Sequence, residues 1–222
     1  SLARQYAGSV TLGTGQFCTN PGLLLGIKGD ELDRFVQDLA EAMVEIEPSI
    51  MLHPNIVGAY ERNKQKAMSQ EGLSVVAELD QDVPANFARQ AVTTVEGSTF
   101  LKNTTLHQEV FGPFTLIVQC EDASQLEEVV SQLEGQLTGT LIAGKDELAM
   151  YGSLVEALQN RVGRSSTTVC LPVSRFVRRW CTGVRIPHQR TAGSPQLAPI
   201  RSEDGQDRSA SRIGRMNFCP KS

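Results

Sequence analysis

Short apolar strands alternate with amphipathic helices over most of this chain, and this alternation limits the folds that the sequence can adopt. The best strand candidate, residues 113–120, is rich in β-branched and aromatic side chains. Residues 29–46 place apolar side chains three and four positions apart, which is the spacing of an amphipathic helix. The alternation predicts an α/β fold with a largely parallel sheet covered by helices.

The boundaries of the expected elements come from caps and prolines. Asp30 is the expected N-cap of the first long helix, and Pro48 ends that helix. Pro54 occupies the first turn of the next helix, where proline is tolerated. The other expected elements are helices over residues 2–12, 54–68, 123–133 and 147–162 and strands over residues 23–27, 74–79, 89–96 and 137–143.

One cysteine lies in a turn-rich segment between the first helix and the first strand. Residues 13–22 read Gly-Thr-Gly-Gln-Phe-Cys-Thr-Asn-Pro-Gly, which places Cys18 in a tight loop. Such a loop can present a thiol to a substrate, and backbone N–H groups freed by glycine can stabilise a thiolate or an oxyanion. The alternative is a small buried hydrophobic side chain, the usual role of a single cysteine. Asn20 and Pro21 are expected to shape the loop rather than to touch a substrate.

Two segments of the sequence resemble motifs of one enzyme family. Residues 15–22, Gly-Gln-Phe-Cys-Thr-Asn-Pro-Gly, resemble the nucleophile motif of the aldehyde dehydrogenase superfamily, nearest to its α-ketoglutaric semialdehyde (2,5-dioxovalerate) dehydrogenases. Residues 107–114, His-Gln-Glu-Val-Phe-Gly-Pro-Phe, resemble the family's Glu-x-Phe-Gly-Pro segment and follow at the expected distance. The resemblance covers residues 1–164 and implies a partial catalytic domain of that family.

The resemblance implies an NAD- or NADP-dependent oxidation of an aldehyde, with 2-oxoglutarate semialdehyde as a candidate substrate. Cys18 would attack the carbonyl carbon, and the thiohemiacetal would give a hydride to the cofactor and leave a thioester for hydrolysis. The Cys18 backbone N–H would be one oxyanion donor. Glu109 would bind the nicotinamide ribose hydroxyls, and Phe111 would pack beside the cofactor. On spacing alone, Glu109 is a surface carboxylate and Phe111 a core aromatic residue.

The resemblance also predicts that part of the site lies outside these 222 residues. In the family, the Rossmann-like domain, the general-base glutamate, the oxyanion-hole asparagine and the ribose-binding lysine precede the cysteine. Only 17 residues precede Cys18 here. The chain alone is therefore expected to be nearly inactive, whereas the intact family member is expected to form a homo-oligomer.

Composition argues against several other classes of protein. No run approaches the roughly 18 apolar residues of a membrane span and no signal peptide is recognisable, so no membrane partner is expected and the cytoplasm is the default location. Five cysteines without a CxxC pair and three separated histidines predict neither a disulfide framework nor a metal site. One competing hypothesis is a catalytically silent module that pairs with a full-length dehydrogenase. Another is a cysteine hydrolase in which His53 or His107 assists Cys18.

The charge balance of the chain changes from acidic to basic at Arg164. Up to Gly163 it has 10 Lys and Arg against 22 Asp and Glu, whereas from Arg164 onward it has 11 against 3. Residues 165–222 are rich in Ser, Arg, Gly and Pro and lack a lasting apolar period, which predicts an irregular or disordered tail. A basic tail could bind a polyanion, but nucleic acid is not the expected partner because aromatic interleaving and a known module are missing.

A shifted reading frame is a second explanation of this tail. If one base is missing just after the codon for Arg164, each intended codon consists of the third (wobble) base of one observed codon followed by the first two bases of the next. Residues 165–222 then yield a string that resembles the carboxyl end of the same dehydrogenases, including the segment HGGPYPA. The resulting hypothesis is that residues 165–222 are frameshifted and not native to the fold.

Overall fold

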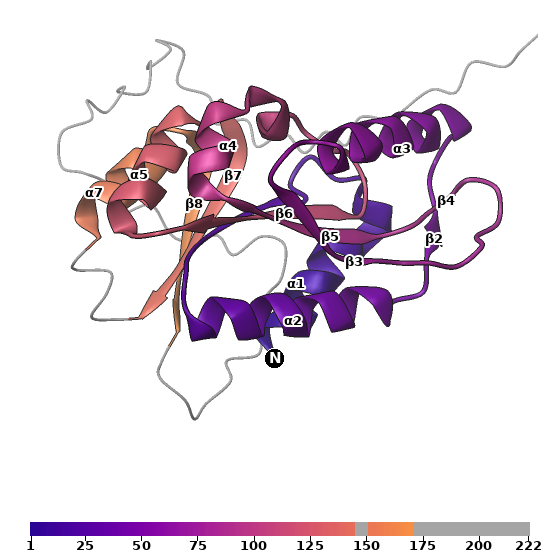
Figure 1. Ribbon diagram of the computed structural model, residues 1–222, viewed down its shortest axis with the longest axis horizontal. Helices are drawn as coiled ribbons and strands as arrows, with labels where there is room; N and C mark the ends of the chain where they lie inside the picture. The colour runs from indigo at the N-terminus through magenta and orange to yellow at the C-terminus, as the bar shows by residue number, and fades with distance from the viewer. Residues whose placement is uncertain (145–150, 171–222) are drawn as a thin grey trace, which may run out of the picture. The chain divides into compact units, whose positions relative to one another are not determined.

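The computed structural model describes residues 1–144 and 151–170, and its central sheet has the strand order β1-β6-β5-β3 (Figure 1). β1 (Leu23–Ile27) lies parallel to β6 (Phe114–Cys120), and β6 lies parallel to β5 (Ala91–Glu96). β3 (Leu73–Glu78) forms one edge and runs antiparallel to β5. The expected α/β architecture with a largely parallel sheet is confirmed.

Helices cover both faces of this sheet (Figure 1). α1 (Leu2–Thr11) and α2 (Asp30–Val44) pack on one face. α3 (Pro54–Met68), α4 (Gly97–Lys102) and α5 (Ala123–Gln132) pack on the other. This part of the chain therefore has three layers, which is how an open, mostly parallel sheet buries both of its apolar faces.

β6 divides the core into two halves, because successive side chains of a strand point to opposite faces. Leu116 and Val118 are buried in the half that contains Phe100 of α4. Ile117 is buried in the other half, which contains Leu39 of α2. The continuous apolar run of β6 is therefore explained by burial on both sides.

The amino-terminal end of α2 differs from the expectation. Gly29 is the N-cap, with no side-chain hydrogen bond, and Asp30 is the first helical residue, so the predicted cap at Asp30 is wrong. Asp30, Glu31 and Asp33 instead lie in the first turn. Three carboxylates there interact favourably with the positive end of the helix dipole, and this can replace a capping side chain.

Five short elements have no counterpart among the expected ones. Each is too short to show a hydrophobic period in the sequence. Besides α4, they are η1 (Leu12–Gly15), η2 (Thr104–His107), β2 (Ser49–Ile50) and β4 (Phe87–Ala88).

A second, two-stranded sheet follows the central one in the sequence. β7 (Gln136–Gly144) pairs in parallel with β8 (Val162–Cys170), and α7 (Gly152–Gln159) lies between them in the chain. The Ser153 hydroxyl donates a hydrogen bond to the Glu127 carboxylate at 2.7 Å and links α7 to α5. The helix expected over residues 147–162 corresponds to α7 in the described residues.

The start of the basic tail also differs from the expectation. An irregular tail from residue 165 is wrong for residues 165–170, because β8 continues through them and pairs with residues 139–144 of β7. The Ser-Ser-Thr-Thr-Val sequence of residues 165–169 suits a strand, since it contains three β-branched residues. Residues 171–222 lie outside the described residues, and most of the frameshift hypothesis falls on them.

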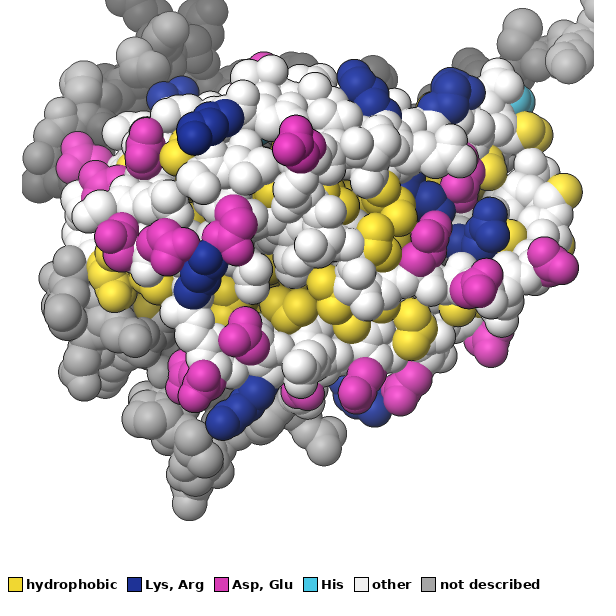
Figure 2. Space-filling view, in the orientation of Figure 1, with side chains coloured by type: hydrophobic (Ala, Val, Ile, Leu, Met, Phe, Trp, Pro, Cys, Tyr) yellow, Lys and Arg dark blue, Asp and Glu magenta, His cyan; other side chains and the backbone are white. Residues whose placement is uncertain are grey.

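Hydrophobic side chains gather across the middle of one face of the molecule, with charged side chains around them (Figure 2). Figure 1 places the strands of the central sheet in the same region. On the edge strand β3, Val75 and Val76 are 47% and 38% exposed. None of the described helices has the length and apolar character that crossing a membrane requires.

Candidate functional site

Cys18 lies in the loop between η1 and β1, as the sequence predicts. The chain leaves α1 and turns sharply through Gly13, Thr14 and Gly15, which have φ angles of 54°, 58° and 67°. Glycine favours this left-handed region, and the hydrogen bond of the Thr14 hydroxyl to the Ile50 carbonyl holds Thr14 in it. The Cys18 thiol is free and exposed, so the buried, purely hydrophobic role is wrong.

The two motif segments meet at one edge of the sheet. The Cys18 loop precedes β1 and residues 109–113 precede β6, and the amino-terminal ends of parallel neighbours lie side by side. A Cβ atom on Gly15 would lie 2.3 Å from the carbonyl carbon and oxygen of Gly112. The two backbones therefore touch, and a larger residue at Gly15 would push them apart.

Asn20 joins the same two segments through its side chain. Its Nδ2 donates to the carbonyl oxygens of Gly15 at 3.1 Å and of Gly112 at 2.9 Å. The Pro21 carbonyl accepts a hydrogen bond from the Tyr6 hydroxyl at 2.6 Å. Asn20 and Pro21 thus shape the loop, as expected.

A second pair of hydrogen bonds holds the loop to β2 and to the residues just after it. The Thr14 hydroxyl donates to the Ile50 carbonyl at 3.0 Å, and the Gln16 Oε1 accepts from the Leu52 N–H at 2.9 Å. These two segments also carry four exposed apolar side chains, which we call the apolar rim. They are Leu12, Phe17, Ile50 and Leu52, with exposed fractions of 51%, 48%, 59% and 86%.

Tyr60 of α3 also packs against Gly112. A Cβ atom on Gly112 would lie 2.3 Å from the Tyr60 ring, so glycine lets the ring approach the backbone. The Tyr60 hydroxyl donates to the Arg89 carbonyl at 2.7 Å. Burial raises the pKa of Tyr60 well above its usual value of 10.0, so the hydroxyl keeps its proton.

Lys64, one turn after Tyr60, is a buried cation that the sequence analysis did not single out. Its side chain is 2% exposed, and its Nζ lies 3.1 Å from Glu61 and 3.0 Å from Glu78. The same Nζ is 5.2 Å from the centre of the Tyr60 ring, within range of a cation–π interaction. The signal was in the sequence, because Lys64 falls on the face of α3 that also buries Tyr60 and Ala67.

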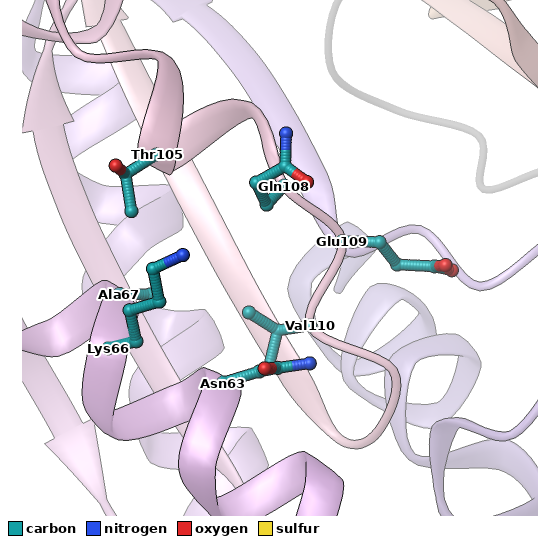
Figure 3. Close-up of a pocket in the computed structure, with 7 residues that line it drawn as sticks. All are labelled: Asn63, Lys66, Ala67, Thr105, Gln108, Glu109 and Val110. Atoms are coloured by element: carbon teal, nitrogen blue, oxygen red, sulfur yellow. The ribbon is translucent and has the colours of Figure 1, made fainter.

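Glu109 and Phe111 lie between η2 and β6, in the segment that Asn20 holds. Glu109 is exposed and lines a hollow together with residues that include Lys66 and Thr105, and Figure 3 shows its carboxylate directed away from these other side chains. Phe111 is half-buried. Within the described residues, the Glu109 carboxylate makes neither an ion pair nor a side-chain hydrogen bond, so it is free to accept from a ligand hydroxyl.

The two histidines proposed as partners of Cys18 have other contacts. His53 is the N-cap of α3, and its Nδ1 accepts a hydrogen bond from the Asn55 N–H at 3.1 Å. His107 stacks on Phe100 with ring centres 4.2 Å apart, and its Nε2 lies 2.8 Å from the Phe100 carbonyl oxygen. Neither contact involves the thiol, and both are explained by local structure.

Sequence comparison relates the chain to a specific group of dehydrogenases, although no protein-family model matches it. It is 33% identical to alpha-ketoglutaric semialdehyde dehydrogenase 2 of Azospirillum brasilense over 195 residues, which cover 88% of this chain and 35% of the relative. It is 30% identical to the alpha-ketoglutaric semialdehyde dehydrogenase of Acinetobacter baylyi over 164 residues, or 73% of this chain and 31% of the relative. The chain therefore spans about a third of the length of these relatives.

Comparison with solved structures gives the same fold. The methylmalonate-semialdehyde dehydrogenase of Oceanimonas doudoroffii superposes with a TM-score of 0.61 at 17% identity, over 75% of this chain and 36% of that one. The NAD-dependent benzaldehyde dehydrogenase of Corynebacterium glutamicum superposes with a TM-score of 0.58 at 15% identity, over 74% of this chain and 36% of that one.

Proposed function

Because the chain belongs to the aldehyde dehydrogenase superfamily in sequence and in fold, we propose that it carries the catalytic cysteine and part of the cofactor site of an aldehyde-oxidising enzyme. The observation that carries this proposal is the contact between Gly15 and Gly112. Through it, the Cys18 loop adjoins the segment of Glu109 and Phe111. A nucleophile and a hydride acceptor must be held together for the reaction to occur.

Cys18 is the proposed nucleophile. Its sulfur attacks the aldehyde carbon, and the carbonyl oxygen of the resulting thiohemiacetal gains the negative charge. Loss of a hydride from that carbon leaves an acyl group on the sulfur as a thioester, and water releases the carboxylate and the free thiol. The backbone N–H of Cys18 makes no backbone hydrogen bond within the described residues, which supports its role as an oxyanion donor.

NAD or NADP is the proposed cofactor, and when bound it accepts the hydride. The exposed carboxylate of Glu109, free of other partners in the described part of the chain, suits the ribose hydroxyls of the nicotinamide half. The half-buried ring of Phe111 suits packing beside the cofactor. The name of the Corynebacterium glutamicum structure, an NAD-dependent dehydrogenase, supports NAD use in the family.

The proposed substrate is 2-oxoglutarate semialdehyde, and the support is the name shared by the two curated relatives. The apolar rim is proposed to contribute to catalysis for any aldehyde substrate, by excluding water. Apolar side chains beside a thiol exclude water from the bound aldehyde, and excluding water strengthens the interaction of an oxyanion with its donors.

A polypeptide of only these 222 residues is proposed to oxidise aldehydes poorly. It spans about a third of the length of its relatives, and its Cys18 thiol is exposed. The alternative is a catalytically silent module that pairs with a full-length dehydrogenase or binds polyanions through its basic tail. That tail lies mostly outside the described residues.

The test joins the amino-terminal part of the Azospirillum brasilense relative to Ser1 and follows reduced cofactor with 2-oxoglutarate semialdehyde and NAD⁺ or NADP⁺. Turnover is expected in the joined polypeptide and little in the 222-residue chain. Cys18→Ala should abolish it, whereas Cys120→Ala, at a buried thiol, should retain it. Turnover that survives Cys18→Ala would contradict the proposal. Absence of turnover in the joined polypeptide, despite native folding, would favour the silent module.

A further inference from the structure

We propose that Asn20 is a positioning residue that sets the place of the Cys18 nucleophile relative to the cofactor-contacting segment 109–112. This inference rests on the proposed function. The side chain donates to Gly15, which lies three residues before Cys18, and to Gly112, which lies one residue after Phe111. It therefore connects the Cys18 loop to Gly112, which lies 92 positions from Asn20 in the sequence.

The chemistry of this bridge requires a carboxamide. Both acceptors are carbonyl oxygens, so both bonds need an N–H donor, and the NH₂ group of asparagine supplies two. The Asn20 Oδ1 is buried and has no hydrogen-bond partner within the described residues. Leaving an acceptor unpaired is unfavourable, so the two donors are the reason why asparagine suits this position. An aspartate of the same shape would turn an anion toward two carbonyl oxygens.

The Asn20 hydrogen bonds can fix the position of the Cys18 loop because Gly112, one of their acceptors, is itself tightly packed. The Tyr60 ring lies against Gly112 and its hydroxyl is bound to the Arg89 carbonyl. Gly112 thus packs closely against both the Tyr60 ring and the Gly15 backbone. Movement of the Cys18 loop away from this segment must break the bond from Asn20 to the Gly112 carbonyl, while the bond to Gly15 fixes the Asn20 side chain within the loop.

The first test measures amide hydrogen exchange in the 222-residue chain. The Asn20→Ala variant should speed exchange of the Gly22 and Phe114 amides, whose bonds lie on the two sides of the bridge, by about tenfold. Asn20→Asp keeps the shape of the side chain and should do the same. Faster exchange at Gly22 alone, or at neither amide, would overturn the proposal.

Gln90→Ala provides the matched control. The Gln90 Nε2 also donates to two backbone carbonyls, those of Met43 and Ile46. The variant therefore removes the same chemical group from the end of α2 rather than from the Cys18 loop. Gln90→Ala should speed exchange of the amides around Met43. It should change the exchange rates of the Gly22 and Phe114 amides no more than those of the rest of the protein.

The second test separates positioning from stability through two reactions of Cys18. Alkylation by iodoacetamide needs only an accessible thiol, whereas acylation by p-nitrophenyl acetate also needs the oxyanion donor in place. Asn20→Ala should lower the acylation rate about tenfold and leave the alkylation rate within about twofold. Equal changes in both rates would overturn the proposal. If the joined polypeptide alkylates but does not acylate at Cys18, the proposed function fails, and amide exchange still decides the role of Asn20.

Discussion

The backbones of Gly15 and Gly112 pack against each other, so closely that a Cβ atom on Gly15 would lie 2.3 Å from the Gly112 carbonyl. Gly15 also has a φ angle of 67°, which side-chain-bearing residues adopt only at a cost. The lack of space for a side chain and the left-handed backbone therefore both require glycine at this position. The contact joins the loop of the proposed nucleophile to the segment of the proposed cofactor contacts.

Gly15→Ala should lower the free energy of unfolding by about 2 kcal/mol or more, because it combines a left-handed backbone with a steric overlap. Gly8→Ala is the control, since Gly8 lies in α1 with nothing within 4 Å of its added Cβ. That change should raise the free energy of unfolding by roughly 0.5–1 kcal/mol. Urea denaturation of both variants measures the difference, and equal effects would contradict the geometry.

Lys64→Met should destabilise the fold by about 1–3 kcal/mol. The change preserves the length of a side chain that is 2% exposed, but leaves the partly exposed carboxylates of Glu61 and Glu78 without their cation. The triple variant with Glu61→Gln and Glu78→Gln should recover part of the loss, because no charge then stays unpaired.

The control for Lys64 is Lys66→Met in the same helix. Lys66 is exposed, and substitutions at such sites usually change stability by less than about 0.5 kcal/mol. A loss of stability at Lys66 as large as that at Lys64 would show that the buried ion pairs are not the cause. Chemical denaturation of the variants, at one pH and ionic strength, provides the comparison.

Stability should decrease with rising pH above 9.0, the usual pKa of a cysteine thiol, because burial raises the pKa of Cys120 to about 11. Between these values the unfolded thiol loses its proton and the folded thiol keeps it, so deprotonation favours the unfolded state. The contribution of this one group is at most about 1.4 kcal/mol per pH unit. Cys120→Ala should reduce the slope, as measured by denaturation below and above pH 9.0.

Two buried tyrosines also contribute to the loss of stability at alkaline pH. Burial raises the pKa of both Tyr6 and Tyr60 above the usual 10.0, so their protons also favour the folded state. The Cys120→Ala variant should therefore still lose stability above pH 10.0. An unchanged slope between 9.0 and 10.0 in this variant would contradict the assignment to Cys120.

Val75→Lys should reduce aggregation of the chain at little cost in stability. Val75 is 47% exposed on β3, an edge of the central sheet, and a lysine on an edge strand discourages pairing with another molecule. Val92→Lys on β5 is the contrasting variant, because Val92 is fully buried and an unpaired charge there should prevent folding. Light scattering at increasing concentration, with circular dichroism as the check of folding, tests both.

Sequencing of the coding DNA tests the hypothesis for residues 165–222. We expect that restoring one base after the codon for Arg164 yields the shifted string with its HGGPYPA segment, and that the restored protein is more soluble than the chain with the basic tail. An intact frame in close relatives, with the same basic tail, would contradict the frameshift. The strand pairing of residues 165–170 is the baseline against which a restored chain is compared.

Local sequence determined most of the individual elements. α3 has the expected bounds, Pro54–Met68, because proline at its first turn and the apolar period are both readable within the segment. β1 also has the expected bounds, and β6 differs by one residue at its start. The loop around Cys18 was predictable for the same reason, since glycine and proline act on the backbone at their own positions.

The tertiary structure decided how these elements combine. The antiparallel direction of β3, the separation of β7 and β8 into a second sheet and the burial of Lys64 depend on which segments meet in space. The bridge from Asn20 to Gly112 is of the same kind, because its partners are 92 residues apart. Periodicity and capping act within one segment, whereas strand pairing and side-chain contacts are selected by the free energy of the whole core. The sequence by itself therefore determined the two motif segments and the elements that carry them, and the fold alone decided that they touch.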